Sequence, residues 1–285
     1  MRANASALAA GRRHSAGRRQ DGTVLAAGNN AACECLVGEW KDVVAVAAGN
    51  VHTAANTGKS HTVGLRSDGT VLATGWNGDG QCDVAAWRDV TVVAAGWRRT
   101  LGLRADGTVQ AAGRSSEGQC DVESWREMVA LACGDWHSVG VLADGSALAA
   151  GNNRRGQCAV DDWRDLIAVA AGYLHTVALR RDGRVLATGD RATGACDVDE
   201  WEDVVALAAG SYHSVGVTAS GRVLAAGGNG FGQCDVGDWQ DIVEVAAGSA
   251  HTLGLRADGT VVSAGNNASS QCDVGFWSAI QVRRA

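Results

Sequence analysis

The chain has 285 residues, of which 46% are hydrophobic, contains no proline and carries a formal net charge of −6 at pH 7. Its length suits one domain that could bury about three quarters of the surface of the unfolded chain. No apolar run approaches the roughly 18 residues that a membrane-spanning helix needs, so a helical membrane protein is excluded.

The strongest signal in the sequence is a repeat marked by tryptophan. Six tryptophans recur at intervals of 38 residues, from position 87 to position 277, and a seventh stands at position 40. A fixed period of this length is typical of a repeat architecture, in which each unit needs its neighbours for burial. The marking residues are Trp40, Trp87, Trp125, Trp163, Trp201, Trp239 and Trp277.

Each unit, followed along the chain, contains four short runs rich in Val, Leu and Thr. In the unit of residues 88–125 they are 90–95, 100–104, 108–112 and a shorter piece at 119–122. Runs of this length, separated by Gly and Asp-Gly, are typical of strands joined by tight turns. Asp-Gly occupies the turn in all units but one, where Ser220-Gly221 replaces it.

A single four-stranded unit cannot bury both of its faces, whereas a closed ring of units leaves no terminal face exposed. The sequence therefore predicts an all-β, seven-bladed β-propeller of four-stranded antiparallel blades. An open β-solenoid is the alternative, but its turns usually join parallel strands. We expect one domain over residues 1–285, with blades at 1–40, 41–87, 88–125, 126–163, 164–201, 202–239 and 240–277, and a closing or frayed tail at 278–285.

Both ends of the chain encode the same strand of the first blade. Residues 5–11 align with the first strand of the next unit, and residues 278–285 begin another copy of it. We expect one copy to pair in the blade while the other frays or lies outside. The N-terminal copy is preferred because it runs unbroken into His14.

The repeat resembles that of the regulator of chromosome condensation family, in its compact bacterial form. The resemblance is carried by Ala-Ala-Gly-x-x-His-Thr/Ser, by the Leu-x-x-Asp-Gly-x-Val that follows, and by Asn-x-x-Gly-Gln-Cys. It implies a seven-bladed propeller used mainly as a binding platform. Repeats shorter than the eukaryotic ones, and Cys-Asp-Val in place of the usual Leu-Gly, count against a eukaryotic-type activity.

Residues that recur at the same place in each unit are interpreted as structural. We expect the histidines to form hydrogen bonds within their own blades, with Arg99 in the third unit; a ring of imidazoles that binds a metal or an anion is the alternative. Seven cysteines share a position at which copies around a ring lie too far apart for disulfides, and free thiols favour a reducing compartment. The histidines are His14, His52 or His61, His137, His175, His213 and His251, and the cysteines are Cys35, Cys82, Cys120, Cys158, Cys196, Cys234 and Cys272.

No catalytic arrangement stands apart from the repeat. Most carboxylates belong to Asp-Gly turns or follow the marking tryptophans, so no acid–base pair can be selected. Neither Cys33 with Cys35 nor the isolated Cys133 has the second ligand pair that a zinc site needs. We therefore predict a non-enzyme with no catalytic residue, no metal and no cofactor; a metal hydrolase using channel-mouth histidines is the enzymatic alternative.

The loops between the repeated glycine and histidine vary, and four consecutive units carry an aromatic residue there. We expect these rings to be exposed on one face and to bind a partner, because Trp, Tyr and Arg dominate interface hot spots. The alternative is that the rings fold over the channel mouth and plug it. The residues assigned to partner binding are Trp97, Arg98, Trp136, Tyr173, Tyr212, Arg12, Arg13, Arg154, Arg155, Trp76 and Phe231.

The variable loops are also basic, although the chain as a whole is acidic. A basic, aromatic rim favours an anionic partner, and overall acidity without a Lys/Arg run makes nucleic acid the weaker choice. A nine-residue insertion at 52–60 makes the longest loop. The cations are Arg12, Arg13, Lys59, Arg98, Arg99, Arg114, Arg154, Arg155 and Arg191, against Asp79, Glu117, Asp135 and Asp190.

The function expected is therefore a monomeric propeller scaffold that binds another protein, without membrane or nucleic-acid contact. We expect it in the cytoplasm, because the apolar patch before Arg12 and Arg13 is too short for a signal-peptide core. The family resemblance implies two alternatives: a GTPase regulator similar to a guanine-nucleotide exchange factor, and a proteinaceous enzyme inhibitor. The sequence does not identify the partner.

Overall fold

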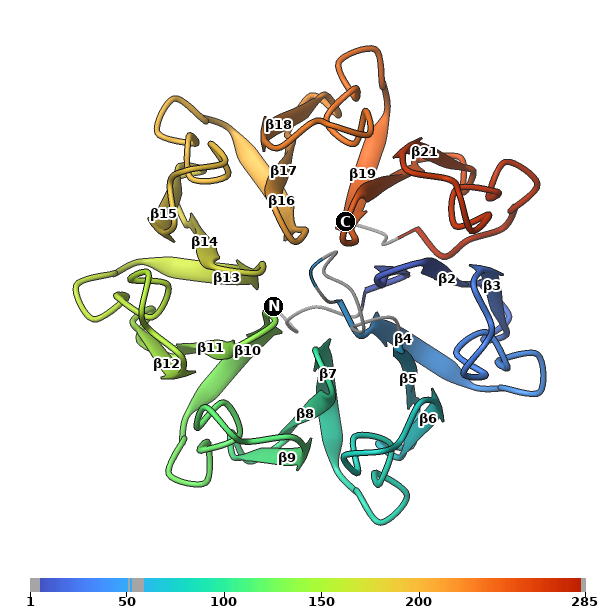
Figure 1. The fold of residues 1–285 in the computed structure, drawn as a ribbon, viewed down its shortest axis with the longest axis horizontal. Coiled ribbons are helices and arrows are strands. Elements are labelled where there is room, and N and C mark those ends of the chain that lie inside the picture. The colour runs from blue at the N-terminus through green and yellow to red at the C-terminus, as the bar shows by residue number, and fades with distance from the viewer. Residues whose placement is uncertain (1–5, 51, 53–58, 283–285) are drawn as a thin grey trace.

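The computed structural model describes residues 6–50, 52 and 59–282. Within them, strands β1 to β21 form seven separate three-stranded antiparallel sheets arranged around one axis (Figure 1). The prediction of an all-β, seven-bladed propeller is confirmed. None of the described segments is a helix that could cross a membrane.

Each sheet takes three consecutive strands, and the first strand of each lies nearest the axis (Figure 1). In chain order the strands are β1 (Leu8–Ala10), β2 (His14–Arg18), β3 (Val24–Gly28), β4 (Val43–Ala48), β5 (His61–Arg66), β6 (Val71–Gly75), β7 (Val90–Gly96), β8 (Arg99–Arg104), β9 (Val109–Gly113), β10 (Met128–Cys133), β11 (His137–Leu142), β12 (Ala147–Gly151), β13 (Leu166–Ala171), β14 (His175–Arg180), β15 (Val185–Gly189), β16 (Val204–Ala209), β17 (His213–Thr218), β18 (Val223–Gly227), β19 (Ile242–Ala247), β20 (His251–Arg256) and β21 (Val261–Gly265).

The fourth run of each unit is not a strand, which corrects the prediction of four-stranded blades. In the second unit, the amide N–H of Val84 donates to the carbonyl of Cys82, and that of Trp87 donates to the carbonyl of Val84. The side-chain oxygen of Asn77 accepts from the amide of Cys82 at 2.7 Å. Local bonds of this kind compete with a sheet ladder, so the run folds into consecutive turns.

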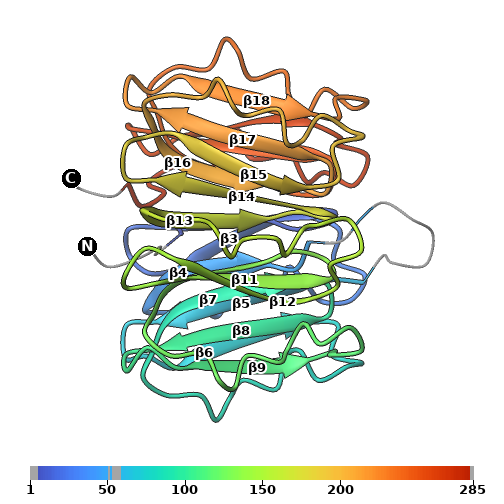
Figure 2. The same ribbon diagram turned by 90° about the vertical axis from the view of Figure 1, so that its left-hand side faces the viewer.

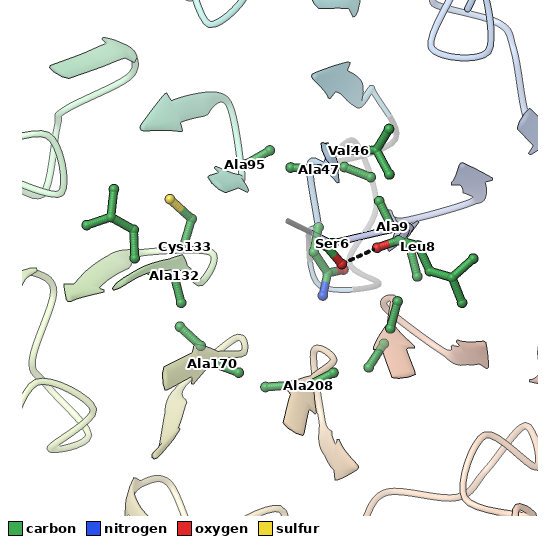
Figure 3. Close-up of a pocket in the computed structure, with 18 of the residues that line it drawn as sticks. Ser6, Leu8, Ala9, Val46, Ala47, Ala95, Ala132, Cys133, Ala170 and Ala208 are labelled. Atoms are coloured by element: carbon green, nitrogen blue, oxygen red, sulfur yellow. Dashed lines mark hydrogen bonds between the residues drawn. The ribbon is translucent and has the colours of Figure 1, made fainter. Parts of the chain in front are cut away.

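The innermost strands contribute small side chains to the central channel. Ala47, Ala95, Ala132, Ala170 and Ala208 are among the residues that line a cavity of about 200 Å³ on the axis (Figure 3). Alanine has little volume beyond the backbone, so seven strands can approach one another there. The channel is therefore narrow.

The hydrophobic core lies between neighbouring sheets. Each of seven buried clusters joins residues of one sheet to residues of the next, and one cluster joins the seventh sheet to the first. In five of the seven units, the marking tryptophan packs over a glycine in the central strand of the following sheet. A Cβ added to Gly64 would lie 2.7 Å from the ring of Trp40, so glycine is required for this contact.

Hydrogen bonds also link neighbouring sheets, through the repeated histidines. His61 Nε2 lies 2.9 Å from Thr100 Oγ1, and that hydroxyl donates to the carbonyl of Gln81 at 2.8 Å. The hydroxyl has one proton, so the imidazole Nε2 must be the donor to it. The expectation that each histidine bonds within its own blade is wrong. The corresponding pairs are His14 with Thr62, His137 with Thr176, His175 with Ser214, His213 with Thr252, and His251 with Ser15.

Arg99 performs the same task in the third sheet. Its Nε donates to the hydroxyl of Ser138 at 3.1 Å, and its terminal nitrogens donate to the carbonyls of Gly134 and Asp135, each at 2.8 Å. The guanidinium is fully buried, and these bonds compensate for its loss of water. The link between sheets is thus kept where the histidine is lost.

The two ends of the chain share the inner strand of the first sheet. β1 pairs with β2, while Ile280 forms an antiparallel bridge with Arg19, and the amide of Gln281 donates to the carbonyl of Arg18 at 2.9 Å. The preference for the N-terminal copy is confirmed, but the expectation that the other copy lies outside is wrong. In the other sheets a β-bulge interrupts the strand at this position, so the break between the two ends falls where the ladder is already irregular.

The Trp–Gly contact predicts an asymmetric response to alanine. Gly64→Ala should lower the free energy of unfolding by about 1–3 kcal/mol, because the added methyl group overlaps the Trp40 ring. Gly38→Ala is the control, since nothing lies within 4 Å of a Cβ placed there. Urea denaturation measures both. Equal losses for the two variants would contradict the packing described.

The histidine ring predicts loss of stability on mild acidification. Burial lowers the pKa of His61, His137, His213 and His251 to about 3, and that of His14 and His175 to about 4, from 6.5. Below pH 6.5 the unfolded chain takes up protons that the folded chain refuses, so stability falls as the pH falls towards these values. At pH 5 each of these histidines lowers the free energy of unfolding by about 2 kcal/mol. Denaturation curves that coincide at pH 7 and pH 5 would contradict a ring of neutral imidazoles.

Candidate functional site

The loops that differ between repeats emerge on one side of the ring, which we call the variable face. They are the loops after the first and after the third strand of each sheet; the Asp-Gly turns form the opposite side, the turn face (Figure 2). Contacts between the two loop sets support this arrangement. The guanidinium of Arg114, after β9, lies 4.7 Å from the ring centroid of Trp97, after β7.

Aromatic rings from four consecutive sheets meet on the variable face, as the sequence predicted. Trp97 and Trp136 lie 4.3 Å apart between centroids in an edge-to-face arrangement, and Tyr173 and Tyr212 are 5.5 Å apart in the same geometry. His52 joins the two pairs: it stacks on Tyr173 at 4.4 Å and lies edge-on to Trp97 at 6.0 Å. No sequence pattern predicted that His52 would connect the two pairs.

Arginine side chains alternate with tryptophan rings along one edge of this cluster. The guanidinium carbon of Arg98 lies 4.4 Å from the centroid of Trp76 and 4.8 Å from that of Trp97. The guanidinium carbon of Arg114 lies 4.7 Å from Trp97 and 5.6 Å from Trp136. We call Trp76, Arg98, Trp97, Arg114 and Trp136 the Trp–Arg ladder. Such cation–π contacts contribute about 0.5–1 kcal/mol each at exposed sites and more when water is excluded.

The exposure of the rings differs from the prediction. Trp97 is only 7% exposed, whereas Trp136, Tyr173 and Tyr212 are half-buried. The rings pack on one another and on guanidinium groups, which loop position alone does not reveal. Binding and plugging are therefore not exclusive, because the inner part of the cluster is buried while its outer part reaches solvent.

Arg98 occupies an unusual backbone position. β7 and β8 pair as far as Gly96 and Arg99, so only Trp97 and Arg98 form the connecting turn. Arg98 has φ 59°, in the left-handed region that favours glycine. A non-glycine residue pays roughly 1–2 kcal/mol there. The turn directs the Arg98 side chain into the ladder, and its two cation–π contacts offset this strain.

Asp135 and His52 form a buried hydrogen-bonded pair on the variable face. The carboxylate oxygen Oδ2 of Asp135 accepts from the amide of His52 at 2.6 Å and lies 2.8 Å from its Nδ1. Burial raises the pKa of Asp135, and the hydrogen bonds from His52 oppose that rise. Burial is also the largest cause that lowers the pKa of Arg12, followed by Arg13. Arg12 is 6% exposed, so its prediction as an exposed contact residue is wrong.

The remaining predicted residues lie outside the ladder. Arg13, Arg154 and Arg155 are exposed, and Phe231 is 55% exposed. Arg13 and Phe231 both line a hollow of about 370 Å³, and no residue of the ladder lines it. Of the insertion at 52–60, residues 53–58 lie outside the described residues.

The charge of the variable face is less one-sided than predicted. The aspartate that follows the repeated cysteine folds back to the loop asparagine: Asp83 Oδ1 accepts from Asn77 at 2.8 Å. Asp235 and Asp273 repeat this contact with Asn229 and Asn267. From the sequence, the only carboxylates expected in these loops were Asp79, Glu117, Asp135 and Asp190. The variable face therefore carries more carboxylates than predicted.

The repeated cysteines have a structural role. The thiol of Cys120 donates to the carbonyl of Arg114 at 3.1 Å, and that of Cys35 to the carbonyl of Asn29 at 3.2 Å. Burial raises the pKa of Cys35 to about 12 and that of Cys82 to about 11, which keeps these thiols protonated and unreactive. Among the residues that the structure describes, no three His, Cys, Asp or Glu side chains are grouped to hold a metal ion.

Comparisons with known proteins agree with this architecture. The model of the regulator of chromosome condensation (RCC1) repeat matches residues 56–81, 90–119, 128–157, 166–191, 204–233 and 242–271, more than half of the chain. The search of curated proteins found no match to this chain.

Several solved structures share the fold at low sequence identity. Prp20p of Saccharomyces cerevisiae superposes with a TM-score of 0.67 at 18% identity, over 93% of this chain and 83% of that one. Human WBSCR16 gives 0.70 at 18%, over 87% and 85%, and the ectodomain of the Arabidopsis thaliana receptor kinase ACR4 gives 0.64 at 22%, over 77% and 84%. At these identities the likeness concerns the fold alone.

The burial of the cluster predicts graded effects of alanine substitution. Trp97→Ala should lower the free energy of unfolding by about 3 kcal/mol, because it empties a buried site. Phe231→Ala should change it by less than about 0.5 kcal/mol, because that ring is exposed. Tyr212→Ala should lie between them. Chemical denaturation that found Trp97→Ala as mild as Phe231→Ala would show that the ring does not pack as described.

Proposed function

Since the chain belongs to the regulator of chromosome condensation (RCC1) repeat family, we propose that it is a non-catalytic propeller that holds a protein partner on its variable face. The turn face is nearly the same in every repeat, as expected of a scaffold. The variable face differs from sheet to sheet and presents rings and guanidinium groups together.

The observation that carries this proposal is the Trp–Arg ladder. Tryptophan, tyrosine and arginine are the residue types most often found at interface hot spots. In the ladder their side chains are already held by mutual stacking, so little conformational entropy remains to be lost on binding. A rigid aromatic and cationic surface of this kind is suited to a protein partner rather than to a small molecule.

The family comparison supports a protein partner. One solved relative, Prp20, is known in complex with Kap60, and binding of Prp20p to Gsp1p and histones is described for that protein. Regulation of a GTPase and inhibition of an enzyme are narrower versions of the same proposal. They differ in what the partner does once it is bound.

A pair of matched variants tests the binding face. One variant combines Arg154→Glu, Arg155→Glu and Phe231→Ala on the variable face. The other combines Arg181→Glu, Arg222→Glu and Phe276→Ala on the turn face. All six side chains are exposed, so both variants should fold with nearly unchanged stability.

Each immobilised protein is incubated with extract of the native source, and the retained proteins are quantified by mass spectrometry. We expect the variable-face variant to retain at least tenfold less of the proteins that the wild type captures. The turn-face variant should retain the same amount as the wild type. The reverse result would place the binding surface on the turn face and overturn the proposal.

A further inference from the structure

We propose that the Trp–Arg ladder recognises carboxylate groups in an acidic segment of the protein partner, through the edges of Arg98 and Arg114. This inference rests on the proposed function and gives the chemistry of the same site.

The ladder leaves the edges of its guanidinium groups as the available surface. Arg98 lies between the rings of Trp76 and Trp97, and Arg114 between those of Trp97 and Trp136. A guanidinium binds a carboxylate in its own plane, through two parallel N–H bonds. Contact with two rings restricts each guanidinium and leaves N–H groups for a carboxylate. Arg114 donates from Nε to Ser116 at 2.7 Å, and its terminal nitrogens have no hydrogen-bond partner among the described residues.

The protein already places a carboxylate at this edge. Asp79 Oδ2 lies 3.4 Å from a terminal nitrogen of Arg98, and both side chains are partly exposed. The contact is long for a charge-assisted hydrogen bond, so it satisfies Arg98 only weakly. Asp79 thus marks where an external carboxylate would bind, and it would compete with that carboxylate.

The backbone at Arg98 also indicates a role for its side chain. With φ 59°, the position favours glycine, yet it holds an arginine whose guanidinium contacts two tryptophan rings. The equivalent loop residues Trp136, Leu174 and Tyr212 have no left-handed φ. Strained backbone of this kind is typical of sites where the side chain must reach a particular place.

The ladder fits an acidic protein segment better than a nucleic acid. Single-stranded nucleic acids bind by stacking bases on open aromatic faces. Here Trp97 is covered by two guanidinium groups, and Trp76 by Arg98 and by Lys59 at 5.5 Å.

Fluorescence anisotropy with defined probes tests the inference. The probes are a fluorescein-labelled peptide of ten glutamates, a Gly-Ser peptide of the same length and an oligo-dT of ten nucleotides. We expect the wild type to bind the glutamate peptide, more weakly as salt rises, and to bind it more tightly than either other probe.

Four variants test whether each side chain strengthens or weakens binding of the glutamate peptide. Arg98→Gly, which also relieves the strained turn, and Arg114→Gln should each weaken binding of the glutamate peptide at least tenfold. Asp79→Asn should strengthen it severalfold by removing the competing carboxylate. Arg181→Gln, on the turn face, is the control and should leave binding unchanged. Melting curves of all four check that they are folded.

Three results would overturn the inference: no binding of the glutamate peptide, tighter binding of oligo-dT, or equal losses in Arg98→Gly and Arg181→Gln. These failures are distinct from failure of the proposed function. If the variable-face variant loses the captured proteins but the glutamate peptide does not bind, the face is right and the carboxylate chemistry is wrong.

Discussion

The hydrogen bond from a buried neutral imidazole to a hydroxyl in the next sheet holds the ring together. Each hydroxyl accepts a hydrogen bond from the histidine of the preceding sheet and donates one to a backbone carbonyl of the same unit as that histidine. Thr252, for example, accepts from His213 and donates to the carbonyl of Gln233. The imidazole must carry a proton on Nε2, because the hydroxyl has already donated its own. Burial, which lowers the pKa of these histidines, keeps the ring neutral. His251 and Ser15 make the same link between the last sheet and the first, so ring closure uses the contact that joins all other neighbouring sheets except the third and fourth, which Arg99 links.

This frame explains why the variable face is free to differ from sheet to sheet. The histidines and hydroxyls that link the sheets lie in strands, and five of the marking tryptophans pack on glycines of the central strands. The side chains in the loops after β7, β10, β13 and β16 take no part in strand pairing, so they can differ from sheet to sheet. The ladder and the His52–Asp135 pair are consequences of that freedom.

Much of the fold could be predicted from the sequence, because period, turn residues and register repeat seven times. The four aromatic loop positions and their common face followed from strand alternation. What could not be predicted is contact between residues that are distant in the chain. His52 reaches Asp135 across two sheets, Arg114 enters between Trp97 and Trp136, and Ile280 completes the strand begun by Leu8. No local pattern encodes these distances. The prediction of a fourth strand was wrong for another reason. Asparagine and aspartate side chains form local hydrogen bonds in that run, and its strand-like composition did not reveal them.

The most direct test of the account is nuclear magnetic resonance of the imidazole nitrogens in ¹⁵N-labelled protein, recorded as the pH is lowered from 7 to the onset of unfolding. The account predicts that His14, His61, His137, His175, His213 and His251 stay neutral and protonated on Nε2 throughout, since burial places their pKa values at about 3 to 4. Titration of these six histidines near pH 6.5 in the folded protein, or protonation on Nδ1, would contradict it.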